Sequence, residues 1–338
     1  MSSGAQSEAA SVHTLSVVIP VYRGEQHLPA LLDELATHTE PRRTPDGYRY
    51  RVAEVILVND CGPDNSALVM RELAAKYDWV RPVWLSRNFG QHPATIAGVA
   101  SSSGDWVITM DEDGQHDPAD MGVLLDAALS NQVSLVYARP VNAAPHTAFR
   151  NVTSRFAKRL ITLMSGGADA SVFHSFRLVL GEVGRSVAAY AGHGVYLDVA
   201  LSWVAATPAT APVSLRAEGE RQSGYNMRSL ISHFWRMVLT SGTRGLRFVS
   251  VLGAAFATFG LILAALLVID RLNGGDVPQG WTSLVVITLV CAGLILYALG
   301  VVAEYIGVAV NMAMGKPLYL ITSDPQAGPL GRQGYGNR

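Results

Sequence analysis

Asp111, Glu112, Asp113 and Gln115 stand close together in the sequence, one residue after the short apolar run Trp106–Thr109. The run has the pattern of a buried strand, and ligands of open α/β sheets bind in the crevice beyond the carboxyl ends of the strands. Mg²⁺ binds one or two carboxylates and completes its shell with water and substrate phosphate. Residues 111–115, here called the acidic cluster, therefore predict a metal–diphosphate site. A solvated acidic turn is the alternative, because short acidic motifs recur by chance.

Strands and helices must alternate to position this cluster. Apolar runs of strand length are separated by segments of helical period, such as the leucines at positions 28, 31, 32 and 35. Such alternation predicts an α/β fold with a mostly parallel sheet that helices cover on both faces. We expect strands at 15–22, 52–58, 80–85, 106–109, 133–137, 172–180 and 211–215, and helices at 28–35, 68–74, 93–100, 118–129 and 195–206.

Polar residues end three of the predicted strands, and these ends would meet at one edge of the sheet. They are Tyr22, Asp60 and Asp111. Taken alone, Asp60 is more typical of a helix cap or a turn, but its alignment with the acidic cluster favours a shared nucleotide pocket. The sequence has no Gly-x-Gly-x-x-Gly fingerprint and no Walker-type loop. A dinucleotide-binding fold and a P-loop nucleoside triphosphatase are therefore disfavoured.

Composition narrows the class of protein further. The 338 residues carry a net charge of −1, so no basic surface predicts nucleic-acid binding. Cys61 and Cys291 are the only cysteines, which excludes a disulfide framework and fits a reducing compartment. Residues 1–14 lack the basic start and the apolar core of a signal peptide, and we expect a flexible N-terminal tail there.

Two long apolar segments explain the hydrophobic content of 49%. Residues 248–269 carry no charge over 22 positions, and at 1.5 Å per residue they span roughly 33 Å, enough to cross a hydrocarbon core. Residues 281–303 form a second uncharged run. The pair predicts a transmembrane hairpin over 247–304. Basic residues flank its outer ends, so the positive-inside rule puts the N-terminal domain and both termini in the cytoplasm, at the inner membrane.

Two amphipathic segments accompany the hairpin. Residues 227–246 place apolar side chains such as Leu230 and Phe234 on one helical face. Because a membrane span follows directly, we expect an interfacial helix, with ordinary core packing as the alternative. Residues 149–164 are basic and amphipathic, which fits a solvated face as well as contact with a membrane or an anionic ligand. Residues 305–338 are expected to be a cytoplasmic tail.

Six segments of the sequence carry, in this order, the motifs of a known family: LSVVIPVYRGEQHLPALLDEL, EVILVNDCGPDNS, LSRNFGQHPATIAGVASSSGDWVITMDEDGQHDP, SFRLV, RQSGYNMRSL and EYIG…GKPLYLI. Together they resemble family 2 glycosyltransferases of the polyprenyl-phosphate type. That group includes dolichol-phosphate mannosyltransferases and bacterial undecaprenyl-phosphate (bactoprenol) glucosyltransferases. The resemblance covers residues 15–323, and an ordered set is far more specific than a single motif. It implies a Rossmann-like GT-A domain over residues 15–226.

The resemblance also implies roles for individual residues. The nucleotide pocket would contain Pro20, Tyr22, Glu25, Val58 and Asp60. The sugar diphosphate would face Asp111, Glu112 and Asp113, and a divalent metal, Mg²⁺ or Mn²⁺, would bind Asp113 and Gln115. Phosphate of the acceptor would be held by Arg177, Arg221 and Ser223, since an arginine fork binds phosphate oxygens bidentately. Asp198 is a weaker candidate for a base or an orienting acid, and a helix-surface carboxylate is its alternative reading.

Three positions depart from the family pattern. Arg23-Gly24 intervene where the family usually has Asn-Glu, Asn59 replaces the first acid of an Asp-Asp pair, and Ser175 stands where some members carry Asp. The last departure puts a catalytic role for that position in doubt. The more apolar stretch 308–314 also departs from the usual tail.

The implied reaction is an inverting transfer of sugar from a nucleotide-diphosphate sugar, expected to be a UDP-hexose, to undecaprenyl phosphate. The product would be a lipid-linked sugar donor for modification of cell-envelope glycans. An acceptor phosphate is already ionised at neutral pH, so positioning matters more than a general base. A transferase acting on polysaccharide and a non-catalytic membrane scaffold are the alternatives. The sequence leaves open the sugar, UDP against GDP, the metal, and whether the protein forms a homo-oligomer.

Overall fold

A computed structural model describes residues 12–142, 172–192, 195–205, 207–216 and 280–329, with scattered positions between 249 and 269. The chain divides into two compact units. The first contains residues 1–155, 169–225 and 317–338, and the second contains 156–168 and 226–316. The first unit holds every described residue of the predicted site.

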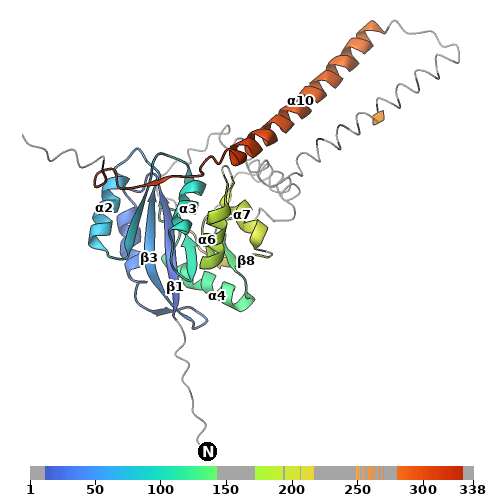
Figure 1. The fold of residues 1–338 in the computed structure, drawn as a ribbon. Helices are drawn as coiled ribbons and strands as arrows, with labels where there is room; N and C mark the ends of the chain where they lie inside the picture. Colours follow the sequence, from blue (N-terminus) through green and yellow to red (C-terminus); the bar gives the residue numbers. More distant parts are fainter. Residues whose placement is uncertain are drawn as a thin grey trace, which may run out of the picture. The chain divides into compact units, whose positions relative to one another are not determined.

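A nine-stranded sheet forms the centre of the first unit (Figure 1). Its strands are β1 (His13–Val21), β2 (Arg42–Arg43), β3 (Arg49–Asn59), β4 (Val80–Leu85), β5 (Trp106–Thr109), β6 (Leu135–Pro140), β7 (Arg177–Leu180), β8 (Ala209–Val213) and β9 (Ile321–Thr322). The order is β8-β6-β7-β5-β1-β3-β4-β9, with β2 paired to β3. β1 is parallel to β3 and β5, β4 to β3, and β8 to β6, whereas β7 and β9 are antiparallel to their neighbours. The predicted, mostly parallel α/β sheet is confirmed.

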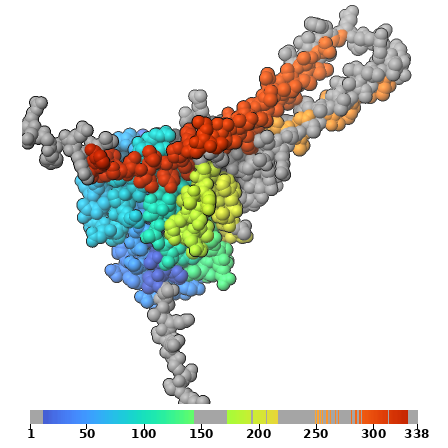
Figure 2. Space-filling model, in the orientation of Figure 1, coloured from blue at the N-terminus to red at the C-terminus, as the bar shows by residue number. Residues whose placement is uncertain are grey.

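Helices cover both faces of the sheet, because successive side chains of each buried strand point to opposite faces. One core contains Val17 and Ile19 with apolar residues of α1 (Leu28–Ala36), α2 (Ser66–Lys76) and α4 (Met121–Asn131). The other contains Val18 with residues of α3 (Gln91–Ala100), α6 (Gly181–Tyr190) and α7 (Leu197–Val204). The last two helices pack side by side at the surface (Figure 2).

Helix α3 lies very close to the sheet. A Cβ atom on Gly98 would stand 2.3 Å from Val18 Cγ1 and 2.9 Å from Val58 Cγ2, so only glycine permits this approach. The close packing holds the first turn of α3 at the carboxyl edge of the sheet. Gln91 and the residues that follow it are thereby brought beside the ends of β1 and β5.

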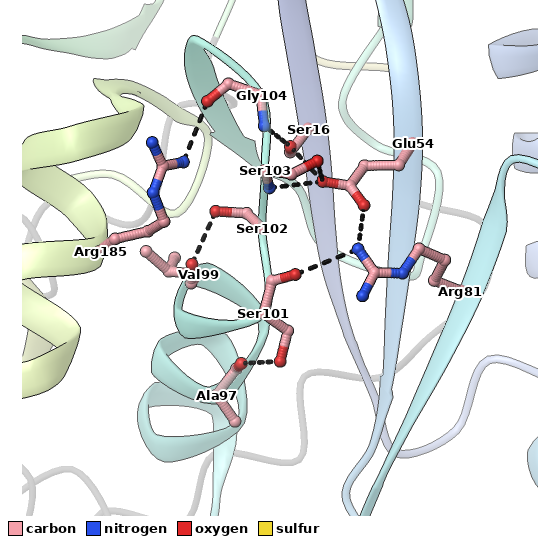
Figure 3. Close-up of polar contacts among 10 residues, drawn as sticks. All are labelled: Ser16, Glu54, Arg81, Ala97, Val99, Ser101, Ser102, Ser103, Gly104 and Arg185. Atoms are coloured by element: carbon pink, nitrogen blue, oxygen red, sulfur yellow. Dashed lines mark hydrogen bonds and ion pairs between the residues drawn. The ribbon is translucent and has the colours of Figure 1, made fainter.

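A buried carboxylate joins three segments at the opposite, amino edge of β5 (Figure 3). Glu54 Oε1 accepts hydrogen bonds from Ser16 Oγ at 2.7 Å and from Ser103 N and Oγ at 2.6 and 2.8 Å. Its other oxygen pairs with Arg81. These contacts link β1 and β3 to the loop that leads into β5, and so fix the strand that carries the acidic cluster at its other end.

The second unit contains α10 (Trp281–Ala313). Among the residues that the structure describes, this is the one helix long and apolar enough to cross a membrane, over Val290–Asn311. The first segment of the predicted hairpin, 248–269, lies mostly outside the described residues, and the amphipathic segments 227–246 and 149–164 lie entirely outside them. The hairpin and the interfacial helix therefore stay predictions.

Candidate active site

The carboxyl ends of β1, β3 and β5 meet where the sequence predicted a shared edge. Met110 N donates to Val18 O at 3.0 Å, and Asp60 N donates to Val21 O at 2.8 Å. The chain therefore leaves β5 and β3 on the two sides of β1. Asp111 and Asp60 enter their loops there, and the exposed Tyr22 follows β1 between them.

The loops after β1 and β3 are tied to each other. Glu25 accepts hydrogen bonds from Asn65 N at 3.1 Å and from its Nδ2 at 3.0 Å, and Gly24 N donates to Ser66 Oγ at 2.8 Å. A Cβ atom on Gly62 would stand 1.6 Å from the carbonyl oxygen of Tyr22. The loops after β1 and β3 therefore form a preassembled wall of the predicted nucleotide pocket. The Glu25 side chain is part of this wall, because it binds Asn65.

Asp60 fixes a third loop of this edge. Its buried carboxylate accepts hydrogen bonds from Phe89 N at 2.7 Å and Gly90 N at 2.8 Å. Burial raises the pKa of Asp60, and the two N–H groups offset part of that rise. Val58, in contrast, is fully buried in the core beneath α3. Its side chain belongs to the core and does not line the predicted pocket, since it points to the sheet face that α3 covers.

Asp111 is held from three directions. Its Oδ1 accepts a hydrogen bond from Gln91 Nε2 at 2.7 Å, and its Oδ2 accepts one from Ser175 Oγ at 2.6 Å. Its backbone N–H donates to Nδ1 of His116 at 3.1 Å. Ser175 occupies the position that departs from the family pattern, and here it orients the first carboxylate of the acidic cluster.

His116 binds the backbone of Asp111 and does so as a neutral ring. Burial lowers the pKa of His116, and the nearby carboxylates of Asp111 and Asp113 raise it only in part. Because Nδ1 accepts a hydrogen bond, the proton of the neutral ring is on Nε2, which lies 3.8 Å from Asp111 Oδ2. The ring stacks on Phe176, with ring centres 4.9 Å apart. The imidazole therefore adds no positive charge beside the carboxylates.

The rest of the acidic cluster has two different environments. Glu112 accepts hydrogen bonds from Tyr22 N at 2.8 Å and Arg23 N at 2.9 Å, so it ties the cluster to the loop after β1. Asp113 Oδ1 accepts from Gln115 N at 3.1 Å. Within the described residues, neither Asp113 Oδ2 nor the Gln115 side chain has a hydrogen-bond partner. Asp113 Oδ2 and the side-chain oxygen of Gln115 are therefore the oxygens of this cluster that remain available to bind a ligand.

The donor set fits a hard cation that shares its shell with substrate. Among the described residues, no group of three histidine, cysteine or acidic side chains could hold a metal without outside help. Asp113 and Gln115 supply one carboxylate and one amide oxygen. Mg²⁺ and Mn²⁺ accept such oxygen ligands and complete their shells with water and phosphate. The site therefore suits a metal that arrives with a diphosphate.

A cavity of about 160 Å³ opens beside Asp111. Its lining comes from the ends of β1 and β5, the start of α3, the residues around β7 and the start of α7: Pro20, Gln91, His92, Thr95, Thr109, Met110, Asp111, Phe173, His174, Ser175, Arg177 and Asp198. Three predicted site residues besides Asp111 thus share one cavity. The contributions of α3 and of His174 were not predicted, although the motif that contains Gln91 was part of the family resemblance.

Arg177 gives this cavity a buried positive charge. The side chain is only 4% exposed, and its Nε donates to Thr109 Oγ1 at 3.1 Å. Its Nη1 pairs with Asp198, the residue predicted as a base or orienting acid. No hydrogen bond reaches Nη2 from the described part of the chain. Arg221 and Ser223, the other residues predicted to hold the acceptor phosphate, lie outside the described residues.

Comparison with known proteins identifies the family. The family model for glycosyl transferase family 2 matches residues 16–182. The undecaprenyl-phosphate 4-deoxy-4-formamido-L-arabinose transferase of Proteus mirabilis is 31% identical over 326 residues, which cover 92% of this chain and 93% of that protein. The chain belongs to glycosyl transferase family 2. The protein of the same name from Edwardsiella ictaluri is 28% identical over 318 residues, covering 93% and 95%.

The likeness to solved structures concerns the fold. The crystal structure of a mycobacterial protein matches with a TM-score of 0.50 and 18% identity, over 69% of this chain and 74% of that one. It agrees with the GT-A-like α/β architecture. The family and the full-length relatives make this protein an enzyme, a glycosyltransferase of the polyprenyl-phosphate type.

Proposed function

We propose that this glycosyltransferase moves a sugar from a UDP-sugar to undecaprenyl phosphate. The observation that carries the proposal is the cavity that contains both Asp111 of the acidic cluster and the buried guanidinium of Arg177. The hydroxyl groups of a donor sugar suit Asp111, and an anionic acceptor suits Arg177. The full-length relatives from Proteus mirabilis and Edwardsiella ictaluri are named for the same acceptor.

The donor would bind along the carboxyl edge of β1, β3 and β5. Its nucleotide would lie against Tyr22 and the tied loops after β1 and β3, and Asp113 with Gln115 would hold the divalent metal. When bound, that metal supplies charge stabilisation to the diphosphate leaving group. Asp111, fixed by Gln91 and Ser175, would accept hydrogen bonds from the hydroxyl groups of the transferred sugar.

The acceptor phosphate would bind Nη2 of Arg177, the guanidinium nitrogen to which the described residues make no hydrogen bond. Its oxygen attacks the anomeric carbon while the bond to the diphosphate breaks, so the configuration of that carbon inverts. A phosphate that is ionised at neutral pH has no proton for a base to remove. Rate enhancement then comes from alignment of the oxygen with the leaving group, which a rigid guanidinium fork can provide.

The acceptor is a lipid, which gives the predicted membrane hairpin its place in the proposal. Helix α10 would be one arm of that hairpin, with the catalytic domain and both termini in the cytoplasm. Single cysteines placed at residues 270–280 in intact cells should react with an impermeant maleimide only from the outer side. Labelling from the cytoplasmic side would contradict this topology.

The donor sugar is tested with a panel of nucleotide sugars, undecaprenyl phosphate and either Mg²⁺ or Mn²⁺. A UDP-hexose is expected to yield radiolabelled lipid, and EDTA should abolish the product. UDP-4-deoxy-4-formamido-L-arabinose is the second candidate, because the relatives named above are transferases for that sugar. Transfer to a polysaccharide, with none to undecaprenyl phosphate for any donor, would contradict the proposal.

A further inference from the structure

Arg177 belongs to a buried polar network that four separate elements build. Asp198 Oδ1 accepts a hydrogen bond from the hydroxyl of Tyr137 at 3.0 Å and also pairs with Arg177 Nη1. Thr109 Oγ1 accepts from Arg177 Nε. Tyr137 is fully buried, and its ring centre lies 5.8 Å from the guanidinium carbon. The four residues come from β5, β6, β7 and α7, so the network is a product of the folded domain.

We propose that Asp198 and Tyr137 are positioning residues for Arg177. They hold one side of the guanidinium so that its other side faces the acceptor phosphate. Arginine has five N–H donors in a planar fork; the protein binds Nε and Nη1, and within the described residues Nη2 has no partner. The inference rests on the proposed function, because the phosphate is the group that Nη2 would meet.

Stability alone does not explain this arrangement. Buried ion pairs are often no more stabilising than apolar side chains of similar volume, because both charges lose their hydration. An acidic residue in the first turn of α7 would favour the helix from solvent as well, yet the Asp198 side chain is only 13% exposed and points to Arg177. A buried arginine that lines a cavity, and that Asp198, Thr109 and Tyr137 hold in place, has a ligand-binding function as its simplest explanation.

The network also disfavours Asp198 as a general base. Asp198 Oδ1 already accepts hydrogen bonds from Arg177 and from the hydroxyl of Tyr137, so this oxygen is occupied by the protein. Burial raises the pKa of Tyr137, and the adjacent Asp198 raises it further. The hydroxyl is therefore a fixed donor to Asp198. The sequence offered base and orienting acid as alternatives, and the geometry supports orientation.

Tyr137→Phe is the most selective test, because it removes one hydroxyl and keeps the buried ring. Initial rates of sugar transfer are measured on the detergent-solubilised full chain, with each substrate varied in turn. The KM for undecaprenyl phosphate should rise about threefold to tenfold, less than the full loss of a hydrogen bond to a charged group, because Tyr137 acts on the acceptor only through Asp198 and Arg177. The KM for the UDP-sugar should not change. Asp198→Asn should raise the acceptor KM, or lower kcat/KM for the acceptor, about tenfold to hundredfold.

Tyr50→Phe is the matched control. Tyr50 is also buried, and its hydroxyl pairs with His38 Nδ1 at 3.0 Å, away from the cavity. It should lower thermal stability, as the loss of a buried hydrogen bond does, without an effect on either KM. Equal acceptor KM values in wild type and Tyr137→Phe would overturn the inference. So would an Asp198→Asn variant that loses kcat at saturating acceptor and no longer shows the acidic limb of the pH profile, since a base would behave that way.

A binding measurement separates this inference from the proposed reaction. Titration calorimetry with farnesyl phosphate reports on the anion site without sugar transfer. If wild type transfers no sugar to undecaprenyl phosphate but binds farnesyl phosphate more tightly than Tyr137→Phe, the proposed reaction fails and the positioning role stands. If the two proteins bind it equally, the positioning role fails whatever the reaction.

Discussion

Glu54→Gln tests whether the buried carboxylate at the amino edge of the sheet stabilises the first unit. Glutamine keeps the size of the side chain and can still present an oxygen to Ser16 and Ser103. The three hydrogen bonds that Glu54 Oε1 accepts from them would lose the charge of the acceptor. On the other side, the new NH₂ group would face the guanidinium of Arg81, donor against donor.

The expected loss follows from these contacts. A hydrogen bond to a charged group contributes about 1.5–3 kcal/mol and a neutral one about 1 kcal/mol, so each of the three bonds weakens by roughly 0.5–2 kcal/mol. Arg81 is 52% exposed, so its ion pair contributes less than about 1 kcal/mol. Glu54→Gln should therefore lower the free energy of unfolding by about 2–6 kcal/mol. Arg81→Ala, the control, should lower it by less than about 1 kcal/mol.

Urea unfolding of the full chain in detergent, followed by tryptophan fluorescence, measures both variants. The pH dependence gives a second check. Burial raises the pKa of Glu54, but hydrogen bonds from Ser16, Arg81 and Ser103 outweigh it and bring the pKa below its ordinary value of 4.5. A lowered pKa means that the stabilisation is complete above that value and is lost as the pH falls through the folded-state pKa.

The difference between wild type and Glu54→Gln should thus be constant from pH 6 to 8, values well above the ordinary 4.5, and should shrink below it. A difference under about 0.5 kcal/mol at neutral pH would refute the reasoning, since it would fall within the range of ordinary surface substitutions. An equal loss in Arg81→Ala would refute it as well, because the exposed ion pair would then account for the whole effect.

Three further predictions concern the candidate active site. Asp113→Ala should abolish formation of radiolabelled lipid while the urea midpoint is nearly unchanged, because Asp113 bonds only Gln115 N within the described residues; wild-type turnover would exclude it as a metal ligand. Gly62→Ala should raise the KM for the UDP-sugar about tenfold to hundredfold, because its Cβ would stand 1.6 Å from Tyr22 O and force the two loops apart; an unchanged KM would contradict the preassembled wall. Burial raises the pKa of the Cys61 thiol, so in a Cys291→Ser background its alkylation should be slow at neutral pH and faster in alkali. UDP-sugar with Mg²⁺ should protect it, and unchanged labelling would place the donor elsewhere.

The sequence predicted best the short strands that carry mostly apolar residues. β4 and β5 were expected at 80–85 and 106–109 and occur there. β5 is the clearer case, because all four of its residues are buried and so form a continuous run. Two kinds of element were missed. Helix α6 starts at Gly181, which is a poor helix former, and no expected helix covered it. β9 is two residues long and pairs Thr322 with Trp84 across most of the chain, a contact that no local pattern can reveal.

The candidate site shows the same limit. The carboxylates of the acidic cluster follow a recognisable strand, so they could be predicted from their own segment. The residues that orient Asp111, namely Gln91, His116 and Ser175, were not predicted as its partners. Gln91 at the start of α3 and Ser175 before β7 reach it only because the folded sheet brings these segments together. The hydroxyl of Tyr137 is hidden in the same way, because a tyrosine in an apolar strand reads as core.

The arrangement of hydrogen bonds leaves the site with one acidic and one basic group for ligands. Asp60 and Glu112 hold backbone N–H groups of neighbouring loops, and Asp111 is fixed by side chains. Within the described residues, only Asp113 and Gln115 of the acidic cluster have side-chain oxygens without partners, and Arg177 has Nη2. The metal that accompanies the diphosphate needs an acidic ligand, and the acceptor phosphate needs a basic one. A sheet edge that already presents both groups can bind both substrates without rearranging. We therefore expect the selectivity for two anionic substrates to depend on the residues that hold these groups in place as much as on the groups themselves.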